Sequence, residues 1–377
     1  MLFSTASLDF TLDPQRKLDI PDITVGENVF SDGSGLMAKS LAIQVAKRKG
    51  IKFRNKRYTP TVFQIRYSRH IIHHFQDFNG AIQRYLGYKG VLMLHPELDQ
   101  EKKHLVHFRK SMKKFNTTTT NTFSVVDYST PYAFGRLNND IIVLLSSLGV
   151  TNEKLLAKQE EYFKWIEDAA TNHLRAIDFL SCLGKYEEAE RVLLGGLDDP
   201  KVLEKVQNAQ KSEIAKFRKG ESEKIRSRMM IHKSRLLYGV CDPYGVLKEG
   251  QVHVRITTEN GAATLINTSV LVVRNPCLHP KVSFSKILGW HFQTYYLIGD
   301  CLKLRAVHHP RLAHLIDCIV FAGVARPDHP SAPSMSSGGD LDGNAGSAMV
   351  KLWLTCLQVI DISYAGIPTL SLPLWLR

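Results

Sequence analysis

Residues 338–344 read GGDLDGN, a glycine-rich stretch in which two aspartates stand two positions apart. In an extended chain, residues i and i+2 point to the same side, and neighbouring glycines let the backbone bend, so Asp340 and Asp342 can converge on one cation. Carboxylate oxygens are the ligands that Mg²⁺ prefers, with water and phosphate in its remaining positions. The stretch therefore predicts a metal site for phosphoryl or nucleotidyl transfer, with Mn²⁺ as an alternative ion.

Other interpretations of this stretch start from the same residues. An exposed turn is the simplest, because Asp and Gly are common turn residues. A calcium-binding EF-hand loop that begins at Asp340 requires Gly at its sixth position and Glu at its twelfth, where this chain has Ala345 and Lys351. A phosphatase with a DxDG segment requires an apolar strand directly before it, but residues 333–339 are polar and rich in Ser and Gly. The calcium and phosphatase interpretations are therefore disfavoured.

The composition indicates an anionic partner. The 377 residues carry a formal net charge of +13 and a pI near 9.4, which is typical of proteins that bind nucleic acid, although charge that serves only solubility gives the same values.

The six cysteines show no CxxC pair and no disulfide-like spacing, which favours a reducing compartment. Residues 1–14 lack the basic start of a signal peptide, and no apolar run reaches membrane-spanning length. We expect an intracellular protein, in the nucleus or cytoplasm rather than secreted, without a membrane partner.

Seven separated stretches resemble, in the same order, the motifs of the cellular RNA-dependent RNA polymerases of eukaryotic RNA silencing. In that family the aspartate stretch reads roughly MSGGDLDGD, and RNPCLHPGD precedes it. The matching stretches here are VFSDGSGLMAKS (29–40), FQIRY (63–67), GYKGVLMLHPEL (87–98), FRKSMKKF (108–115), SRLLYGVCDPYGVLKEGQVHV (234–254), RNPCLHP (274–280) and GGDLDGN (338–344). The resemblance covers most of the chain, and the number and order of the motifs make it specific.

The resemblance implies an α+β fold of two double-psi β-barrels joined by a helical segment. On this pattern, residues 1–135 form the first barrel region, residues 136–232 the helical connection and residues 233–344 the second barrel with the aspartate loop. Apolar residues between Asn152 and Leu180 recur at steps of three and four, which independently predicts an amphipathic helix there. Residues 345–377 match nothing in the family, so we expect an incomplete second barrel followed by a hydrophobic tail with no domain to cover.

The resemblance also implies roles for individual residues. Asp340 and Asp342 would bind the metal, and Asn344 stands where the family has a third aspartate of the catalytic loop. Lys89 and Lys114 would be catalytic cations from the first barrel, because metal ions only partly neutralise the charge of a triphosphate and its transition state.

Substrate binding is expected of four further residues. By analogy with a related RxPTLH segment of multisubunit RNA polymerases, Arg274 and Asn275 would contact the ribose hydroxyls and His279 would lie near the phosphates. Arg109 would support the catalytic lysines. A buried strand end followed by a turn is the alternative for residues 274–280.

The predicted function is templated transfer of nucleotides from ribonucleoside triphosphates to RNA, which makes double-stranded RNA for RNA silencing and siRNA production. The partners would be an RNA template, the triphosphates and the silencing machinery. The basic stretches 47–57 and 201–235 either contact RNA phosphates or form solvated surfaces. Because Asn344 has no charge, the alternative is a catalytically inactive RNA-binding remnant of the family.

Two stretches and the end of the chain depart from the family pattern. Residues 68–86 separate RY from GYKG, residues 281–298 separate HP from GD, and the pattern stops at Asn344. Functional insertions usually enter exposed loop tips, whereas these interrupt tight motifs. We therefore interpret the chain as a stretch of the catalytic core with translated, intron-like inserts and a truncated C-terminus. The first insert also contains three histidines: His70, His73 and His74. No Cys or carboxylate pattern accompanies them, so a metal site there is disfavoured.

We predict that the mature messenger RNA lacks the codons of both inserts. One cause, unspliced introns, then explains the two interruptions and the loss of the pattern at Asn344. The native protein would read RY directly into GYKG, HP into GD, and GGDLDG into an aspartate. Sequencing transcripts across the locus checks this, and uninterrupted reads that contain both inserts and the Asn344 codon would contradict it.

Overall fold

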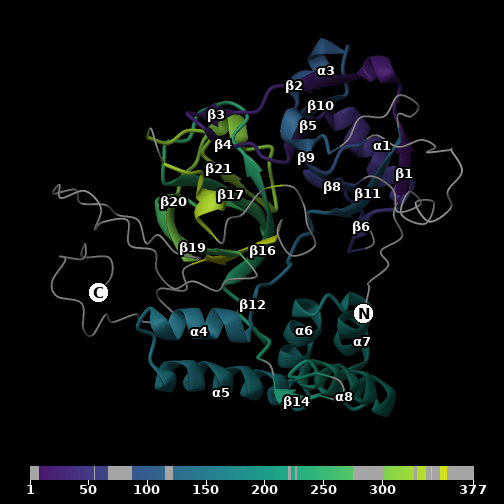
Figure 1. Ribbon diagram of the computed structural model, residues 1–377. Coiled ribbons are helices and arrows are strands. Elements are labelled where there is room, and N and C mark those ends of the chain that lie inside the picture. Colours follow the sequence, from purple (N-terminus) through teal and green to yellow (C-terminus); the bar gives the residue numbers. More distant parts are fainter. Residues whose placement is uncertain are drawn as a thin grey trace, which may run out of the picture.

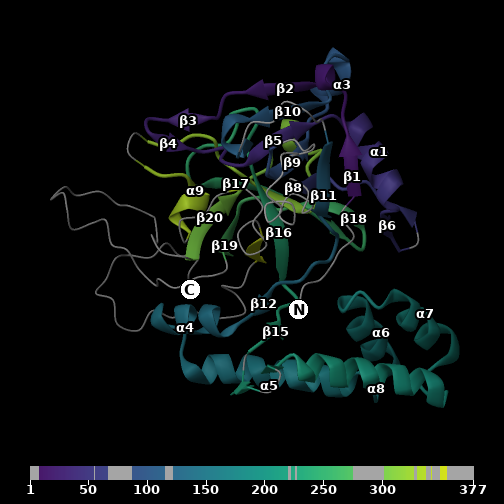
Figure 2. The ribbon, with the colours of Figure 1, turned by 45° about the vertical axis from the view of Figure 1, so that its right-hand side comes forward.

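The computed structural model shows two β-sheet modules side by side, with a layer of helices beneath them (Figures 1 and 2). It describes residues 8–54, 56–66, 87–114, 122–219, 222–225, 227–274, 301–326, 329–336, 341 and 349–354. The proposed inserts 68–86 and 281–298, with the three histidines of the first, lie outside the described residues. The α+β class predicted from the sequence is confirmed, and both sheets are curled.

The first module is a seven-stranded sheet in the order β1-β11-β8-β9-β5-β10-β2. The strands are β1 (Leu8–Thr11), β2 (Lys17–Ile20), β5 (Ser34–Met37), β8 (Val62–Arg66), β9 (Gly90–Leu94), β10 (Val106–Arg109) and β11 (Thr122–Tyr128). Its other elements are η1 (Pro14–Arg16), β3 (Thr24–Val25), β4 (Asn28–Val29), α1 (Lys39–Lys49), β6 (Lys52–Phe53), β7 (Lys56–Arg57), α3 (Glu97–Glu101) and η2 (Lys110–Met112).

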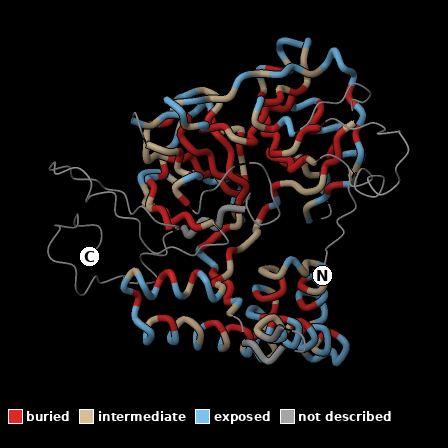
Figure 3. Tube along the Cα trace, viewed as in Figure 1, coloured by how far each residue is buried: buried red, intermediate tan, exposed pale blue. Residues whose placement is uncertain are grey.

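Burial explains why these residues form this module. Every residue of β5 and β9 is buried, and β9 is a nearly continuous apolar run, as expected of a strand covered on both faces. Helix α1 buries four apolar side chains at helical spacing and ends at Gly50, which takes a left-handed φ of 66°. In the tube view the buried residues gather inside each sheet module and on one side of the helices (Figure 3).

The helical layer lies between the two modules in sequence. Its elements are β12 (Arg136–Leu137), α4 (Asn139–Ser147), α5 (Asn152–Asp168), α6 (His173–Cys182), α7 (Tyr186–Gly195), α8 (Pro200–Ala215), β13 (Arg218–Lys219), β14 (Ser222–Ile225) and β15 (Met229–Met230). The single helix predicted between Asn152 and Leu180 is wrong, because the chain forms two. Asn172 caps the second one, where its side-chain oxygen accepts a hydrogen bond of 3.0 Å from the backbone N–H of Arg175.

None of the helices in the described part of the chain combines the length and the apolarity that crossing a membrane requires. The four cysteines in that part have free thiols: Cys182, Cys241, Cys301 and Cys318.

The second module is a seven-stranded sheet in the order β18-β17-β20-β19-β22-β16-β21, and β17 also pairs with β21. Its strands are β16 (Ser234–Cys241), β17 (Gln251–Thr258), β18 (Gly261–Thr264), β19 (Thr268–Arg274), β20 (Cys301–Ala306), β21 (Cys318–Phe321) and β22 (Met349–Leu354). Two short helices follow β20 and β21: η4 (Pro310–Leu312) and α9 (Ala332–Met335).

Strand β22 corrects one expectation. Residues 345–377 were expected to form a tail without a domain to cover, but Met349–Leu354 pairs with β16 on one side and β19 on the other. Together with the β17–β21 pairing, β22 completes a ring of hydrogen-bonded strands. An apolar segment satisfies its backbone groups best inside such a sheet, and this explains why the segment pairs there.

Glu213 of α8 joins the helices of this layer to its short strand β12. Its side chain is fully buried and accepts hydrogen bonds from Arg136 of β12, Tyr162 of α5 and Lys216. Arg136 also donates to the backbone carbonyl of Arg228, at 3.0 Å. Burial alone would raise the pKa of Glu213, but the hydrogen bond and charge of Arg136 outweigh it and the pKa is lowered. The carboxylate therefore stays charged and paired.

We predict that Glu213→Gln lowers the free energy of unfolding at pH 7 by about 3 kcal/mol, because it leaves the half-buried Arg136 without its counter-charge. Because the pKa of Glu213 is lowered on folding, its contribution is complete at neutral pH. That contribution is lost as the pH falls from the ordinary glutamate pKa through the lowered one, so the difference between the two proteins should shrink there. Urea unfolding at several pH values measures both effects.

The matched control is Glu204→Gln, which removes an exposed carboxylate from the same helix. This change should alter stability by no more than about 0.5 kcal/mol. Equal effects of the two substitutions would show that the buried network contributes nothing beyond surface charge.

Candidate functional site

The centre of the aspartate loop is held against the first module. Leu341, which stands between the two aspartates, is 2% exposed and packs in an apolar cluster with Phe30. Its backbone N–H donates a hydrogen bond of 2.8 Å to the carbonyl of Asp32. Asp340, Asp342 and Asn344 themselves lie outside the described residues. The loop is therefore anchored at the turn that precedes β5, on the opposite module.

That turn is organised by a half-buried carboxylate. Asp22 accepts hydrogen bonds from the backbone N–H and hydroxyl of Ser111, at 2.9 and 2.6 Å, and from the hydroxyl of Ser31, at 3.1 Å. The Ser111 hydroxyl oxygen in turn accepts from the N–H of Gly33, at 3.0 Å. Residues from the VFSDGSG and FRKSMKKF motifs thus share one network. Sequence reasoning missed Asp22, because no motif includes it.

The third motif of the first module, GYKGV, meets the same turn at Gly90. The N–H of Val91 donates to the carbonyl of Gly33 at 2.8 Å, and the backbone of Gly90 has a φ of +152°. A Cβ added at Gly90 would lie 2.2 Å from that carbonyl oxygen. Only glycine allows the two segments to approach so closely.

The two predicted catalytic lysines flank this meeting point. Lys89 is half-buried, and its N–H donates to the carbonyl of Met112 at 2.9 Å. Lys114 is exposed, its N–H donates to the carbonyl of Gly87 at 2.7 Å, and its ammonium group donates to the carbonyl of Ser111 at 3.0 Å. The structure therefore brings the predicted cations to the module that also anchors the aspartate loop.

Arg109, predicted to contact substrate, is only 6% exposed. Its Nε donates to the carbonyl of Ser34 at 3.0 Å and its Nη1 to that of Pro21 at 2.7 Å. Burial lowers the pKa of Arg109, and the nearby Cys241 and Asp22 act in the opposite direction. Its guanidinium holds together the backbone segments on either side of the 31–34 turn.

Arg274 ends β19, and it is half-buried. Its backbone N–H donates to the hydroxyl of Ser336 at 3.3 Å, which ties the end of β19 to the segment just before the aspartate loop. Asn275 and His279 lie outside the described residues. The structure thus ties the first residue of RNPCLHP to Ser336, which stands two residues before the GGDLDGN segment.

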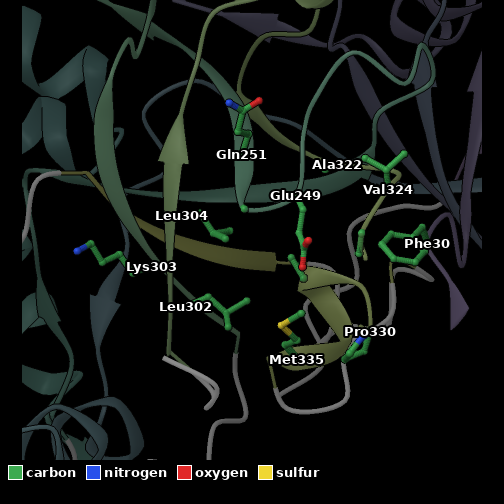
Figure 4. A pocket seen from close by; sticks show the side chains of 13 residues that line it. Phe30, Glu249, Gln251, Leu302, Lys303, Leu304, Ala322, Val324, Pro330 and Met335 are labelled. Carbon is green, nitrogen blue, oxygen red and sulfur yellow. The ribbon is translucent and has the colours of Figure 1, made fainter. Parts of the chain in front are cut away.

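A small pocket lies beside this segment, between the strands of the second module and α9 (Figure 4). At its mouth the carboxylate of Glu249 lies 2.6 Å from Nδ1 of His329 and 3.5 Å from Nε of Arg326. Burial lowers the pKa of Lys303 to about 8. Phe30 and residues 249–251 belong to two of the matched motifs, although nothing in the sequence predicted a pocket. The lining residues are mostly apolar: Phe30, Glu249, Gly250, Gln251, Leu302, Lys303, Leu304, Ala322, Val324, Ala325, Pro330, Ala332 and Met335.

The basic stretch 47–57 divides into packed and exposed residues. Phe53 stacks on Tyr132 with ring centroids 5.9 Å apart and meets Tyr186 of α7 edge-on at 5.8 Å. The guanidinium of Arg54 lies over both tyrosine rings, at 5.2 and 5.6 Å. These two residues therefore join the first module to the helical layer. Six basic residues of the stretch are exposed, Arg54 among them: Lys47, Arg48, Lys52, Arg54, Lys56 and Arg57.

A family model and relatives of known family match most of the chain. The family model described as "RNA dependent RNA polymerase" matches residues 1–287 and 291–347. Over 352 residues the chain is 31% identical to the "Probable RNA-dependent RNA polymerase 1" of Oryza sativa subsp. japonica, a match that covers 91% of this chain and 40% of the rice protein. It is 30% identical over 335 residues to the "RNA-dependent RNA polymerase 1" of Arabidopsis thaliana, covering 86% of this chain and 25% of that protein.

A solved structure has the same fold. "RNA dependent RNA polymerase QDE-1 from Thielavia terrestris" superposes with a TM-score of 0.63 and 19% identity, over 96% of this chain and 38% of that one. The chain thus spans 40% or less of each of these three proteins.

The contact between Gly90 and Gly33 generates a prediction. Gly90→Ala should lower the free energy of unfolding by about 3 kcal/mol, because the new methyl group must displace the Gly33 carbonyl from a backbone hydrogen bond. Gly50→Ala is the matched control, since Gly50 also has a positive φ of +66° but no atom within 4 Å of an added Cβ. The control should cost about 1 kcal/mol. Similar losses in urea unfolding would contradict the close approach.

Proposed function

The chain belongs to the RNA-dependent RNA polymerase family, and from this premise we propose that its two sheet modules form the active site of an RNA-directed RNA polymerase. The reaction joins the 3′ hydroxyl of an RNA strand to the α-phosphate of a ribonucleoside triphosphate, chosen by an RNA template, and releases pyrophosphate. The observation that carries the proposal is the hydrogen bond from Leu341 to Asp32, which holds the aspartate loop against the lysine-bearing module.

The donor chemistry of the loop fits Mg²⁺. Asp340 and Asp342 offer carboxylate oxygens, which a hard divalent cation prefers. When bound there, Mg²⁺ would neutralise phosphate charge and favour the ionised 3′ hydroxyl. Mn²⁺ accepts the same oxygen ligands. We propose these two residues as the metal ligands, with Asn344 beside them as a neutral oxygen donor.

The residues of the first module would act on the triphosphate. Lys89 and Lys114 would place fixed positive charge where negative charge develops on the phosphates. Arg109 would act as a positioning residue, because its bonds to Ser34 and Pro21 hold the turn against which the aspartate loop packs. Arg274 and the neighbouring Asn275 and His279 would bind the ribose and phosphates.

Finer features of the fold and biology are part of the same proposal. The ring of strand pairings in the second module supports a double-psi β-barrel, and the first module would be its counterpart. The product would be double-stranded RNA that enters siRNA production. The partners would be an RNA template, ribonucleoside triphosphates and the RNA-silencing machinery, in the nucleus or cytoplasm. The exposed basic residues of stretch 47–57 would contact RNA phosphates.

The second candidate function is RNA binding without catalysis. Asn344 motivates it, since an amide carries no negative charge to neutralise a pair of divalent ions. Phosphate contacts alone would still bind RNA, with an affinity that falls steeply as salt rises and depends little on sequence.

We predict that the purified chain incorporates labelled UTP poorly or not at all on a single-stranded RNA template in Mg²⁺. Asn344→Asp should raise incorporation at least about tenfold, which corresponds to roughly 1.4 kcal/mol of transition-state stabilisation. We expect this gain because the added carboxylate supplies the negative charge that the amide of Asn344 lacks, and this charge helps to neutralise the divalent ions. Single-turnover incorporation measures it.

Two comparisons make this experiment decisive. Asn344→Asp combined with Asp342→Asn should return to the background rate, because one carboxylate ligand is lost again. Robust incorporation by the unchanged chain would contradict the role given to Asn344. Salt-dependent RNA binding with no gain from Asn344→Asp would instead favour the RNA-binding function.

A further inference from the structure

A group of potential metal ligands lies outside the polymerase site, where α3 leads into β10. Glu101 is the last residue of α3, His104 follows in the connection, and His107 is the second residue of β10. One donor atom from each side chain lies within 4.8 Å of the other two. The two imidazole rings have centroids 5.8 Å apart.

One ring nitrogen of His107 has no other use in the described part of the chain. Nε2 of His107 is buried and has no hydrogen-bond partner there. A buried polar atom without a partner is uncommon in folded proteins and points to a bound water or ion. The pKa of His107 is lowered, mainly by burial, while the charge of Glu101 acts in the opposite direction, so this carboxylate lies near the ring.

The backbone around the group is already held in place. The carboxylate of Asp99 in α3 accepts hydrogen bonds from the N–H groups of Lys39 and Ser40, at 2.7 and 3.0 Å, which fixes α3 on the start of α1. On the other side, Arg16 donates through Nη1 to the carbonyl of Lys102 and accepts from the N–H of Leu105, both at 2.7 Å. The three ligands therefore project from a fixed frame.

The donor set selects the type of ion. Two imidazole nitrogens and one carboxylate suit Zn²⁺, which binds His nitrogen at about 2.0–2.1 Å and leaves a fourth tetrahedral position for water. Mg²⁺ and Ca²⁺ prefer ligand sets made only of oxygen. Ligands of a tetrahedral Zn²⁺ stand about 3.3 Å apart, so side-chain rotations of Glu101 and His104 would close the 4.8 Å group around an ion. Glu101 is exposed and the histidines are half-buried, which leaves a path for the ion to enter.

We propose that Glu101, His104 and His107 form a Zn²⁺ site that fastens the end of α3 to β10. The site is separate from the proposed polymerase chemistry. Its ion would brace the strand that leads to Arg109, and it would stabilise the folded chain because a preformed ligand set exists only there.

A second group of this kind in the described residues does not carry the same inference. Asp178, Cys182 and His232 also place donor atoms within 4.8 Å of one another. However, the carboxylate of Asp178 already accepts from Nε1 of Trp165 at 2.8 Å and from the Cys182 thiol at 3.8 Å. Asp178 and Cys182 thus already have partners without an ion, and the group provides a contrast for the test.

The test titrates the metal-stripped full chain with Zn²⁺ against a chromogenic chelator, in excess Mg²⁺ so that sites made of oxygen are filled. We expect one tightly bound Zn²⁺ and a higher unfolding temperature with Zn²⁺ than with chelator. Glu101→Gln and His104→Gln should each weaken Zn²⁺ binding at least about tenfold and abolish the thermal shift. Co²⁺ in place of Zn²⁺ should give visible bands of a tetrahedral site without a thiolate charge-transfer band.

The controls are His308→Gln, which removes an exposed imidazole outside the group, and Cys182→Ser, which removes the thiol of the second group. Both should bind Zn²⁺ as the unchanged chain does. Circular dichroism without metal checks that each variant folds, and Glu101→Gln alters only an exposed side chain. Failure to bind Zn²⁺, unchanged affinity in both ligand variants, or loss of binding in Cys182→Ser would overturn the proposal.

Discussion

The apolar core that the two sheet modules share is the constraint on which the rest of the molecule depends. One continuous cluster contains Phe63 and Val91 from the first module and Tyr238 and Val320 from the second. Burial of this surface drives the association, but it has no direction. Polar bonds across the core supply the alignment: the Tyr238 hydroxyl donates to Asp127 at 2.7 Å, and the backbone N–H of Ile316 donates to the Thr61 hydroxyl at 3.1 Å. The modules therefore face each other in one relative orientation. Only in that orientation does the aspartate loop meet the 31–34 turn.

The candidate site is built largely from backbone contacts rather than from side chains that face substrate. Gly90 allows two strands to touch, Asp22 accepts hydrogen bonds from Ser111 and from the Ser31 hydroxyl, and Arg109 donates to two carbonyls beside the turn. A polymerase needs its lysines and aspartates held at a fixed separation, because misplaced charges stabilise the transition state poorly. The buried Arg109 helps to fix this separation by holding the turn in place, without contacting substrate itself.

The helical layer is held by two different kinds of contact: one to its own strand β12, where the chain enters the layer, and one to the first module. Glu213 is tied to Arg136 in a buried ion pair, whereas Phe53 and Arg54 reach Tyr186 through ring and cation–π contacts. The ion pair loses stability when either partner is removed, because an uncompensated charge stays buried. The aromatic contact is closer to the surface and is worth less. The attachment near β12 and β15 is therefore the stronger one.

The sequence by itself determined the family, the α+β class and the paired carboxylates of the GGDLDGN stretch, because short motifs and charge depend on neighbouring residues. It also placed Asn344 where the family has an aspartate. Only the tertiary structure decided that Arg109 is buried, that Met349–Leu354 forms a strand between β16 and β19, and that Leu341 bonds to Asp32. The helix predicted over residues 152–180 is two helices in the structure. The reason is local: Asn172 caps the second helix, and the spacing of apolar residues does not reveal such a cap. The other features join residues far apart in the chain, and no local pattern encodes which distant backbone group will satisfy a buried donor.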